Sequence, residues 1–299
     1  MSDDPITPRG RKLISAGSAI ADQAPDEMTF LHSALCQCHL PRRRTEERVF
    51  IRSDGQTSLR VEAGALYLGD PGWVEQPMPY GVKPRIIMLY LTTYAVRHRT
   101  RNVFVEESLA GFLRLLGQPT SGGPRGSYAA FRSQLAALSA ANISLGYVGR
   151  DGMAYTKSGR PINEVQAWAN VDAHRRQPWP REVTLSQPFY DALQDLSVPL
   201  DPRAIAALSK SSLDLDIYTW LAHRLHRVGK NGQQIHWVSL RRQFGAVYAD
   251  NREFAKTFKQ SLKRVMGVYP AARVSAIRGG LMLRSSPPPI PKRRHVVAF

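Results

Sequence analysis

The fold of this chain is decided by residues 250–284, whose sequence is DNREFAKTFKQSLKRVMGVYPAARVSAIRGGLMLR. Asp250 is a preferred N-cap residue, and Glu253 three positions later completes a capping-box pattern. Apolar and basic residues then recur at helical spacing. Two short strands follow, Arg273–Ile277 and Leu281–Arg284, joined through a glycine turn. The stretch therefore predicts an amphipathic helix followed by a β-hairpin.

Four cations lie in line on one face of the predicted helix, at positions i, i+4, i+7 and i+11. They are Arg252, Lys256, Lys259 and Lys263. The apolar side chains, from Phe254 to Val265, fall on a different face, which we expect to anchor the helix to the body. Because the major groove of DNA admits a helix and is edged by phosphates, the basic face predicts binding to duplex DNA. A solvated helix on a basic protein is the alternative interpretation.

The composition of the chain also favours a polyanionic partner. Its 299 residues carry a formal net charge of +17, and 43% of them are hydrophobic, which suffices for a core and about two domains. Such an excess of cations favours nucleic acid, with an anionic membrane surface as the competing partner. No apolar run approaches the roughly 20 residues of a membrane-spanning helix, and the acidic first residues do not resemble a signal peptide. We therefore expect a cytoplasmic protein.

A repeated order of elements predicts the architecture. Residues 108–156 and residues 239–284 each indicate a short helix, a turn, a longer helix and two strands around a glycine turn. This order is typical of a helix-turn-helix followed by a β-hairpin wing, in which the second helix enters the major groove. We therefore predict an α+β fold of tandem winged-helix domains, joined by a Pro-containing segment near residues 172–180.

Composition divides the chain into four predicted parts. They are a flexible basic leader at 1–58, an N-terminal winged-helix domain at 59–177, a C-terminal winged-helix DNA-binding domain at 178–286, and a Pro-rich basic tail at 287–299. Within the leader, Arg42-Arg43-Arg44 forms a basic run. This run is either a solvated linker or an arm that lies on phosphates.

Further residues are candidate DNA contacts by their predicted positions. Arg278, at the tip of the C-terminal hairpin, and Arg284, on its return strand, are placed to reach the neighbouring backbone or minor groove. The corresponding helix of the N-terminal half is less basic, so a protein interface or a core helix is the alternative for its candidates. These are Arg125, Ser127, Arg132 and Ser133, together with Arg150 at the following turn.

Motifs for catalysis are absent or incomplete in the sequence. The only Gly-Lys pair, Gly229-Lys230, lacks the rest of a P-loop, and no histidines have the His-x-His spacing typical of strand-nicking replication enzymes. Asp214 and Asp216 are two apart on a predicted helix, so their side chains do not face each other. Cys36 and Cys38 lack the second cysteine pair of a structural zinc site. We predict no enzymatic activity, no cofactor and no bound metal.

Several motifs outside the basic helix are distinctive. They are Met78–Arg85 (MPYGVKPR), Leu200–Leu208 (LDPRAIAAL), Leu215–Ala222 (LDIYTWLA) with Arg224–Arg227 (RLHR), Gln243–Gly245 (QFG) and Ser285–Pro289 (SSPPP). Together they resemble the plasmid-encoded RepA replication initiators of Gram-negative bacteria, over a stretch from about Leu59 to Pro289. The DIYTWL segment is quite specific, whereas the basic helix alone is not. The CQCH and LPRRR runs of the leader also resemble the N-terminal part of that family.

The resemblance implies a protein that binds repeated sites, called iterons, in a plasmid origin. It implies further that the protein helps to open an adjacent AT-rich segment and recruits host helicase and initiator proteins. Autorepression by a dimer and origin firing by a monomer are also implied.

We therefore expect a replication initiator that binds double-stranded DNA without catalysis and that self-associates as a dimer. A transcriptional repressor of the same architecture is one alternative. A metal-dependent nickase or relaxase that uses carboxylates such as Asp214 and Asp216 is the other.

Overall fold

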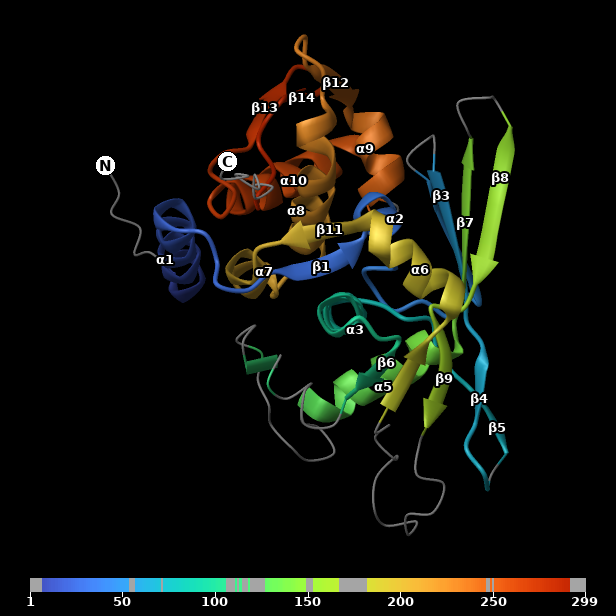
Figure 1. The fold of residues 1–299 in the computed structure, drawn as a ribbon. Coiled ribbons are helices and arrows are strands. Elements are labelled where there is room, and N and C mark those ends of the chain that lie inside the picture. The colour runs from blue at the N-terminus through green and yellow to red at the C-terminus, as the bar shows by residue number, and fades with distance from the viewer. Residues whose placement is uncertain are drawn as a thin grey trace.

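The computed structural model of the chain describes residues 7–53, 57–70, 72–105, 111, 113–114, 118, 127–148, 153–166, 182–245, 248 and 250–290. Helices and small antiparallel sheets are mixed along these residues, which confirms the α+β class (Figure 1). The α-helices are α1 (Pro8–Asp22), α2 (Ser33–Gln37), α3 (Val82–His98), α5 (Ser127–Ala140), α6 (Gln187–Leu196), α7 (Pro202–Leu208), α8 (Ser212–Arg224), α9 (Trp237–Phe244) and α10 (Asn251–Met266). None of the described helices is both long and apolar enough to span a lipid bilayer.

Some predicted features lie outside the described residues. They are most of the helix at 109–116, the candidate contacts Arg125 and Arg150, the joining segment 172–180, and the end of the tail from residue 291.

The C-terminal half contains the elements predicted from residues 250–284. β12 (Gln233–His236), β14 (Gly280–Arg284) and β13 (Arg273–Ile277) form a three-stranded antiparallel sheet with β14 in the centre. β12 and β14 approach so closely that a Cβ atom on Gly280 would lie 2.0 Å from the carbonyl oxygen of Ile235. α9 begins at Trp237, two residues before the short helix expected from residue 239, and the centroid of the Trp237 ring lies 6.0 Å from that of Phe258. Trp237 therefore packs against α10 as the first residue of α9.

The N-terminal half is organised around α3 and a four-stranded antiparallel sheet. The strands lie in the order β2 (Val49–Ser53), β3 (Thr57–Glu62), β7 (Asn142–Val148) and β8 (Ala154–Gly159). α3 is buried along most of its length, and α5 packs against it. The predicted hairpin after α5 is present as β7 and β8, but β3 and β2 extend it into a wider sheet.

Two smaller sheets complete this half. β6 (Asn102–Phe104), β10 (Glu182–Leu185) and β9 (Ile162–Gln166) form one of them, with β10 in the centre. β4 (Ala65–Tyr67) and β5 (Trp73–Glu75) form a hairpin that projects from the body (Figure 1).

Residues 7–53 belong to the folded body, in contrast to the flexible leader expected for residues 1–58. β1 (Thr29–His32) pairs antiparallel with β11 (Ser197–Leu200), and β2 is an edge strand of the larger sheet. α1 packs against α7, and α2 packs against α8. β1 and α2 are at most five residues long, and they and α1 contact elements that are distant in sequence. Thr29, for example, donates to the carbonyl oxygen of Leu200, 171 residues away.

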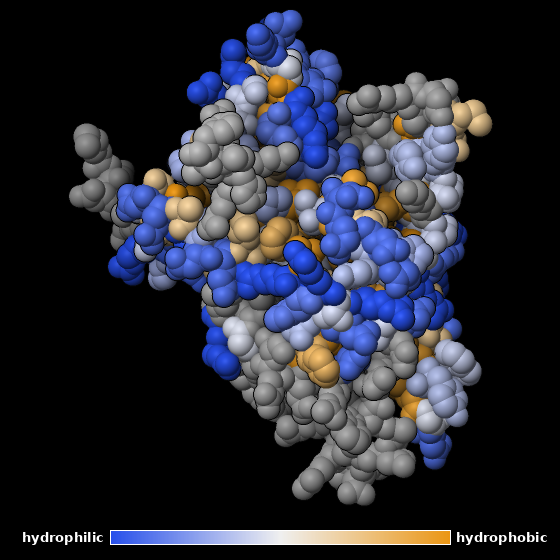
Figure 2. All heavy atoms as spheres, viewed as in Figure 1, coloured by the Kyte–Doolittle hydropathy of each residue, from blue (hydrophilic) through white to orange (hydrophobic). Residues whose placement is uncertain are grey.

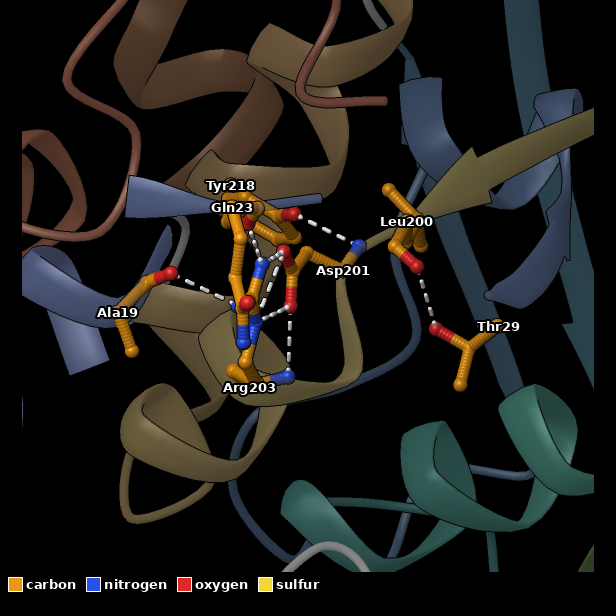
Figure 3. Close-up of polar contacts among 7 residues, drawn as sticks. All are labelled: Ala19, Gln23, Thr29, Leu200, Asp201, Arg203 and Tyr218. Atoms are coloured by element: carbon orange, nitrogen blue, oxygen red, sulfur yellow. Dashed lines mark hydrogen bonds and ion pairs between the residues drawn. The ribbon is translucent and has the colours of Figure 1, made fainter. Parts of the chain in front are cut away.

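A polar cluster fixes α1 to the start of α7 (Figure 3). The Asp201 carboxylate caps α7 by accepting from the backbone N–H of Arg203 at 2.8 Å, and it also accepts from the Arg203 guanidinium at 2.7 Å. Arg203 then donates to the carbonyl oxygens of Ala19 at 2.8 Å and Gln23 at 2.9 Å. The backbone N–H of Asp201 donates to the Tyr218 hydroxyl at 3.1 Å. The LDPRAIAAL and LDIYTWLA motifs therefore meet at this cluster.

A buried ion pair joins α3 to α8. Arg85 Nε lies 2.6 Å from Asp216 Oδ1, and Arg85 Nη2 lies 2.8 Å from Asp216 Oδ2. The same guanidinium donates to the carbonyl oxygens of Leu40, Pro41 and Gly81. All five N–H groups of Arg85 therefore have acceptors. The pair links the MPYGVKPR motif to the LDIYTWLA motif and ties the N-terminal segment to both.

Candidate nucleic-acid interface

α10 is anchored to the body through its apolar face. Phe254, Phe258 and Val265 are fully buried, and each contributes roughly 1.5–3 kcal/mol by its removal from water. The Phe258 ring lies 5.4 Å from that of Phe254 and 5.4 Å from that of Phe244 on α9. The Asp250 carboxylate accepts from the backbone N–H of Glu253 at 2.8 Å, which confirms the predicted N-cap. This hydrogen bond holds the pKa of Asp250 below its usual value.

The opposite face of α10 carries the four predicted cations. Arg252, Lys256, Lys259 and Lys263 are all exposed, so the predicted division of the helix into two faces is confirmed. Within the described part of the chain, no carboxylate lies within ion-pair distance of any of them. Lys259 Nζ lies 5.4 Å from the centroid of the Trp237 ring. The face is therefore a row of positive charges that the described carboxylates leave unneutralised, and its contact with DNA stays a prediction.

Arg264, which follows Lys263 directly, is paired with a carboxylate, unlike the four cations of the outer face. Its guanidinium binds the carboxylate of Asp214 through two hydrogen bonds of 2.7 and 2.8 Å. Arg9 of α1 adds a third contact to the same carboxylate, at 2.6 Å. The α10 cation that points into the protein is thus neutralised, whereas the four on the outer face are not. Because packing does not require the outer charges, their alignment favours an anion outside the protein.

The β13–β14 hairpin adds exposed arginines. Arg278 lies at the turn, directly before Gly279, whose positive φ of 88° favours glycine. Arg284 is exposed on β14, as the sequence predicts, and its register partner Arg273 on β13 is exposed as well. Arg273 was not predicted as a contact, although the alternation of β13 places it opposite Arg284. In Figure 2, hydrophilic residues dominate the top of the molecule, where Figure 1 places β12, β13 and β14.

The candidates of the N-terminal half lie elsewhere. Arg132 and Ser133 are half-buried on α5, and the side chain of Ser127, at the start of that helix, is outside the described part. Gln134, one position further, is buried and accepts from the backbone N–H of Tyr80 at 2.8 Å. α10 lies in the upper part of the molecule in Figure 1, and α5 lies in the lower part. The structure therefore does not bring the two candidate sets together into one surface.

The carboxylates considered for metal-dependent nicking are engaged in other interactions. Asp214 is bound by Arg9 and Arg264, and Asp216 is bound by Arg85. Among the described residues, no three His, Cys, Asp or Glu side chains are arranged to hold a metal ion. The interpretation of Asp214 and Asp216 as nuclease ligands thereby loses its geometric basis.

The two cysteines lie in the interior, and Cys38 Sγ donates to the carbonyl oxygen of Thr57 at 3.5 Å. Cys36 and Cys38 are fully buried. Burial raises the pKa of Cys36 well above that of an exposed thiol, which disfavours the reactive thiolate.

Comparisons with known proteins bear on the same region. A family model described as plasmid encoded RepA protein matches residues 78–239, which is more than half of the chain. This range includes the MPYGVKPR, LDPRAIAAL and LDIYTWLA motifs. No curated protein matches the sequence.

Two crystal structures of domains 2 and 3 of RctB are similar in fold. The structure of the selenomethionine derivatives is 11% identical with a TM-score of 0.53, and the match covers 85% of this chain and 99% of that chain. The other is 12% identical with a TM-score of 0.50, and the match covers 84% of this chain and 96% of that one. At these identities the similarity concerns the fold alone.

Proposed function

Because the chain belongs to the plasmid-encoded RepA family, we propose that it is a replication initiator that binds duplex DNA at a plasmid origin through α10 and the β13–β14 hairpin. The outer face of α10 carries this proposal, since its four cations are exposed and aligned and have no carboxylate partner among the described residues. A DNA duplex presents one negative charge for about every 1.7 Å of its axis, and cations that displace its counterions bind it. The buried aromatic side chains behind the face hold it rigidly in place.

We assign a winged-helix arrangement to the C-terminal half. The order α8, β12, α9, α10, β13, β14 supports this assignment, with α9 and α10 as the helix-turn-helix and the hairpin as the wing. Residues near the N-terminus of a recognition helix contact base edges, and arginine binds guanine through two hydrogen bonds. Arg252 is therefore our candidate for base recognition. The three lysines of the face are candidates for phosphate contacts, and Arg278, Arg284 and Arg273 are candidates for contacts with the flanking backbone.

A second, less basic module is proposed for the N-terminal half. It consists of α5 and the β7–β8 hairpin, with candidate contacts at Arg125, Ser127, Arg132, Ser133 and Arg150. The separation of α5 from α10 in Figure 1 suits two contacts on successive faces of a duplex. Bending the DNA to meet both modules costs several kcal/mol, which the contacts of the second module offset.

The protein acts by binding and not by catalysis in this proposal. Copies loaded on repeated sites deform the adjacent AT-rich DNA, whose pyrimidine–purine steps unstack readily, and they recruit host helicase and initiator proteins. Self-association as a dimer gives the form that represses the gene of the protein itself.

The experiment that tests the proposal is a salt titration of DNA binding. The purified full chain is footprinted on the non-coding DNA of its own plasmid, and the Kd for the protected site is measured between 50 and 200 mM salt (a range chosen for its sensitivity to phosphate contacts). Lys259→Ala and Lys263→Ala are each expected to reduce the slope of log K against log salt by about one, because each removes one phosphate contact.

A matched control is available on the N-terminal sheet. Arg60 is an exposed cation on β3 that is paired with Glu62, so Arg60→Ala should leave the slope unchanged. If both lysine variants also keep the wild-type slope, the DNA-binding surface lies away from α10 and the proposal is wrong.

A further inference from the structure

Of the four cations on the outer face of α10, Lys259 has a neighbour that the others lack within the described residues. Its Nζ lies 5.4 Å from the centroid of the Trp237 ring, which is within the distance of a cation–π contact. Arg252, Lys256 and Lys263 make no such ring contact in the described part of the chain. Lys259 therefore differs from its neighbours in the support that it receives, although all four side chains are exposed.

The Trp237 ring is held in place by the aromatic side chains that anchor α10. Its centroid lies 6.4 Å from that of Phe254 and 6.0 Å from that of Phe258, with interplanar angles of 76° and 70°. These are edge-to-face contacts, an arrangement that aromatic pairs prefer. Both phenylalanines are fully buried, whereas Trp237 is half-buried. The ring therefore connects the core to the surface at the position of Lys259.

The backbone of Trp237 connects the same position to the β13–β14 hairpin. Its N–H donates to the carbonyl oxygen of Gly279 at 2.9 Å, and Gly279 follows Arg278 at the turn of the hairpin. Trp237 is also the first residue of α9, so a single residue contacts α10 and the hairpin from the start of α9. A side chain that Trp237 supports is therefore held at a defined place relative to both elements proposed to contact DNA.

Support of this kind matters for a lysine because its side chain is long and flexible. An exposed lysine loses rotamer freedom when it binds a phosphate, and this loss reduces the affinity. A ring that already restricts the ammonium of Lys259 removes part of the loss before DNA arrives. The contact also keeps the charge. Because an ammonium has three N–H donors, donors remain for a phosphate on the side away from the ring.

We propose that Trp237 is a positioning residue for DNA binding, which holds the ammonium of Lys259 where a backbone phosphate of the duplex meets α10 beside the hairpin. The inference rests on the proposed function, to which it adds an uncharged residue. It implies that Lys259 and Lys263 contribute equally to the salt slope but unequally to the affinity. A cation–π contact at an exposed site amounts to a factor of about two to five in a binding constant, so Lys259→Ala should weaken binding more than Lys263→Ala by this factor.

A double-mutant cycle on the footprinted DNA tests the inference with the full chain. Trp237→Leu is expected to weaken binding about two- to fivefold and to keep the wild-type salt slope, because Lys259 keeps its charge. In a chain that already carries Lys259→Ala, Trp237→Leu should have no further effect, because no ammonium remains to be positioned. Trp237→Phe should recover part of the affinity, because phenylalanine keeps a ring that attracts a cation less strongly than tryptophan does. Thermal unfolding confirms that each variant is folded at the temperature of the assay.

Lys263 is the matched control, because it is exposed on the same face and contacts no ring in the described structure. Trp237→Leu should weaken binding by the same factor with and without Lys263→Ala. Equal coupling of Trp237 to both lysines would show that its ring supports α10 as a whole, and this result would overturn the inference. Independent effects of Trp237→Leu and Lys259→Ala would overturn it as well.

The salt slopes separate a failure of this inference from a failure of the proposed function. If Lys259→Ala keeps the wild-type slope while Lys263→Ala reduces it, Lys259 is not at a phosphate, so the inference is refuted and the proposed function stands. If both lysine variants keep the wild-type slope, the proposed function is wrong and the inference fails with it.

Discussion

The buried pair between Arg85 and Asp216 predicts a large and non-additive effect on stability. The two side chains are 9% and 6% exposed, so removal of one partner leaves the other charge in a dry environment. Asp216→Asn is expected to cost about 3–5 kcal/mol for this reason. Arg85→Met should cost more, because it also removes donors from the carbonyl oxygens of Leu40, Pro41 and Gly81, at about 1–3 kcal/mol for each acceptor that stays dry.

The double variant separates the charge effect from the carbonyl effect. Arg85→Met with Asp216→Leu leaves no unpaired charge, so it should be more stable than Arg85→Met alone, with a coupling energy of at least about 2 kcal/mol. Urea unfolding followed by circular dichroism measures all four free energies. Arg44→Met is the control, because the Arg44–Glu46 pair is 68% and 86% exposed and should contribute less than about 1 kcal/mol. A coupling energy near zero would refute the conclusion that this pair joins α3 to α8.

Two further predictions concern His39 and Gly280. Burial lowers the pKa of His39 from 6.5 to about 4, so the unfolded chain binds a proton that the folded protein excludes. The free energy of unfolding should therefore have its full value above about pH 6.5 and fall toward pH 4, by up to about 1.4 kcal/mol per pH unit. Urea unfolding of His39→Leu should show a weaker pH dependence over this range. Gly280→Ala should lower the melting temperature by forcing β14 away from Ile235, at a cost of about 1–3 kcal/mol in the free energy of unfolding. Gly229→Ala is the control and should leave the melting temperature unchanged, because no atom lies within 4 Å of its new Cβ. Equal melting temperatures for the two variants would contradict the close approach of β12 and β14.

The C-terminal half could be predicted closely because its local signals agree. The N-cap, the helical period and the alternation after it all indicate the same elements, and β13 has the predicted bounds while β14 begins one residue early. The predicted faces of α10 also separate Lys263, which is exposed, from Arg264, which is bound to Asp214. A helical period of 3.6 residues is enough to distinguish two adjacent cations.

The N-terminal segment could not be predicted in the same way, because its order depends on distant partners. β1 is only four residues long and pairs with β11 far along the chain. Arg85 and Asp216 are 131 residues apart, and no local pattern connects them. The contact between Arg42 and Tyr248 has the same origin, because the basic run at Arg42 is visible in the sequence but its neighbour Tyr248 is found only in the fold.

The family motifs and the candidate DNA-binding face occupy different parts of the molecule. Arg85, Asp201 and Asp216, which lie within the motifs, make buried contacts that assemble the scaffold. The family match ends at residue 239, whereas α10 begins at Asn251. The matched residues therefore account for how the two halves are held together, and the α10 residues that we expect to read DNA lie beyond them. It follows that substitutions on the outer face of α10 should alter the recognised site while leaving the scaffold intact, because the anchoring contacts lie on the opposite face of the helix.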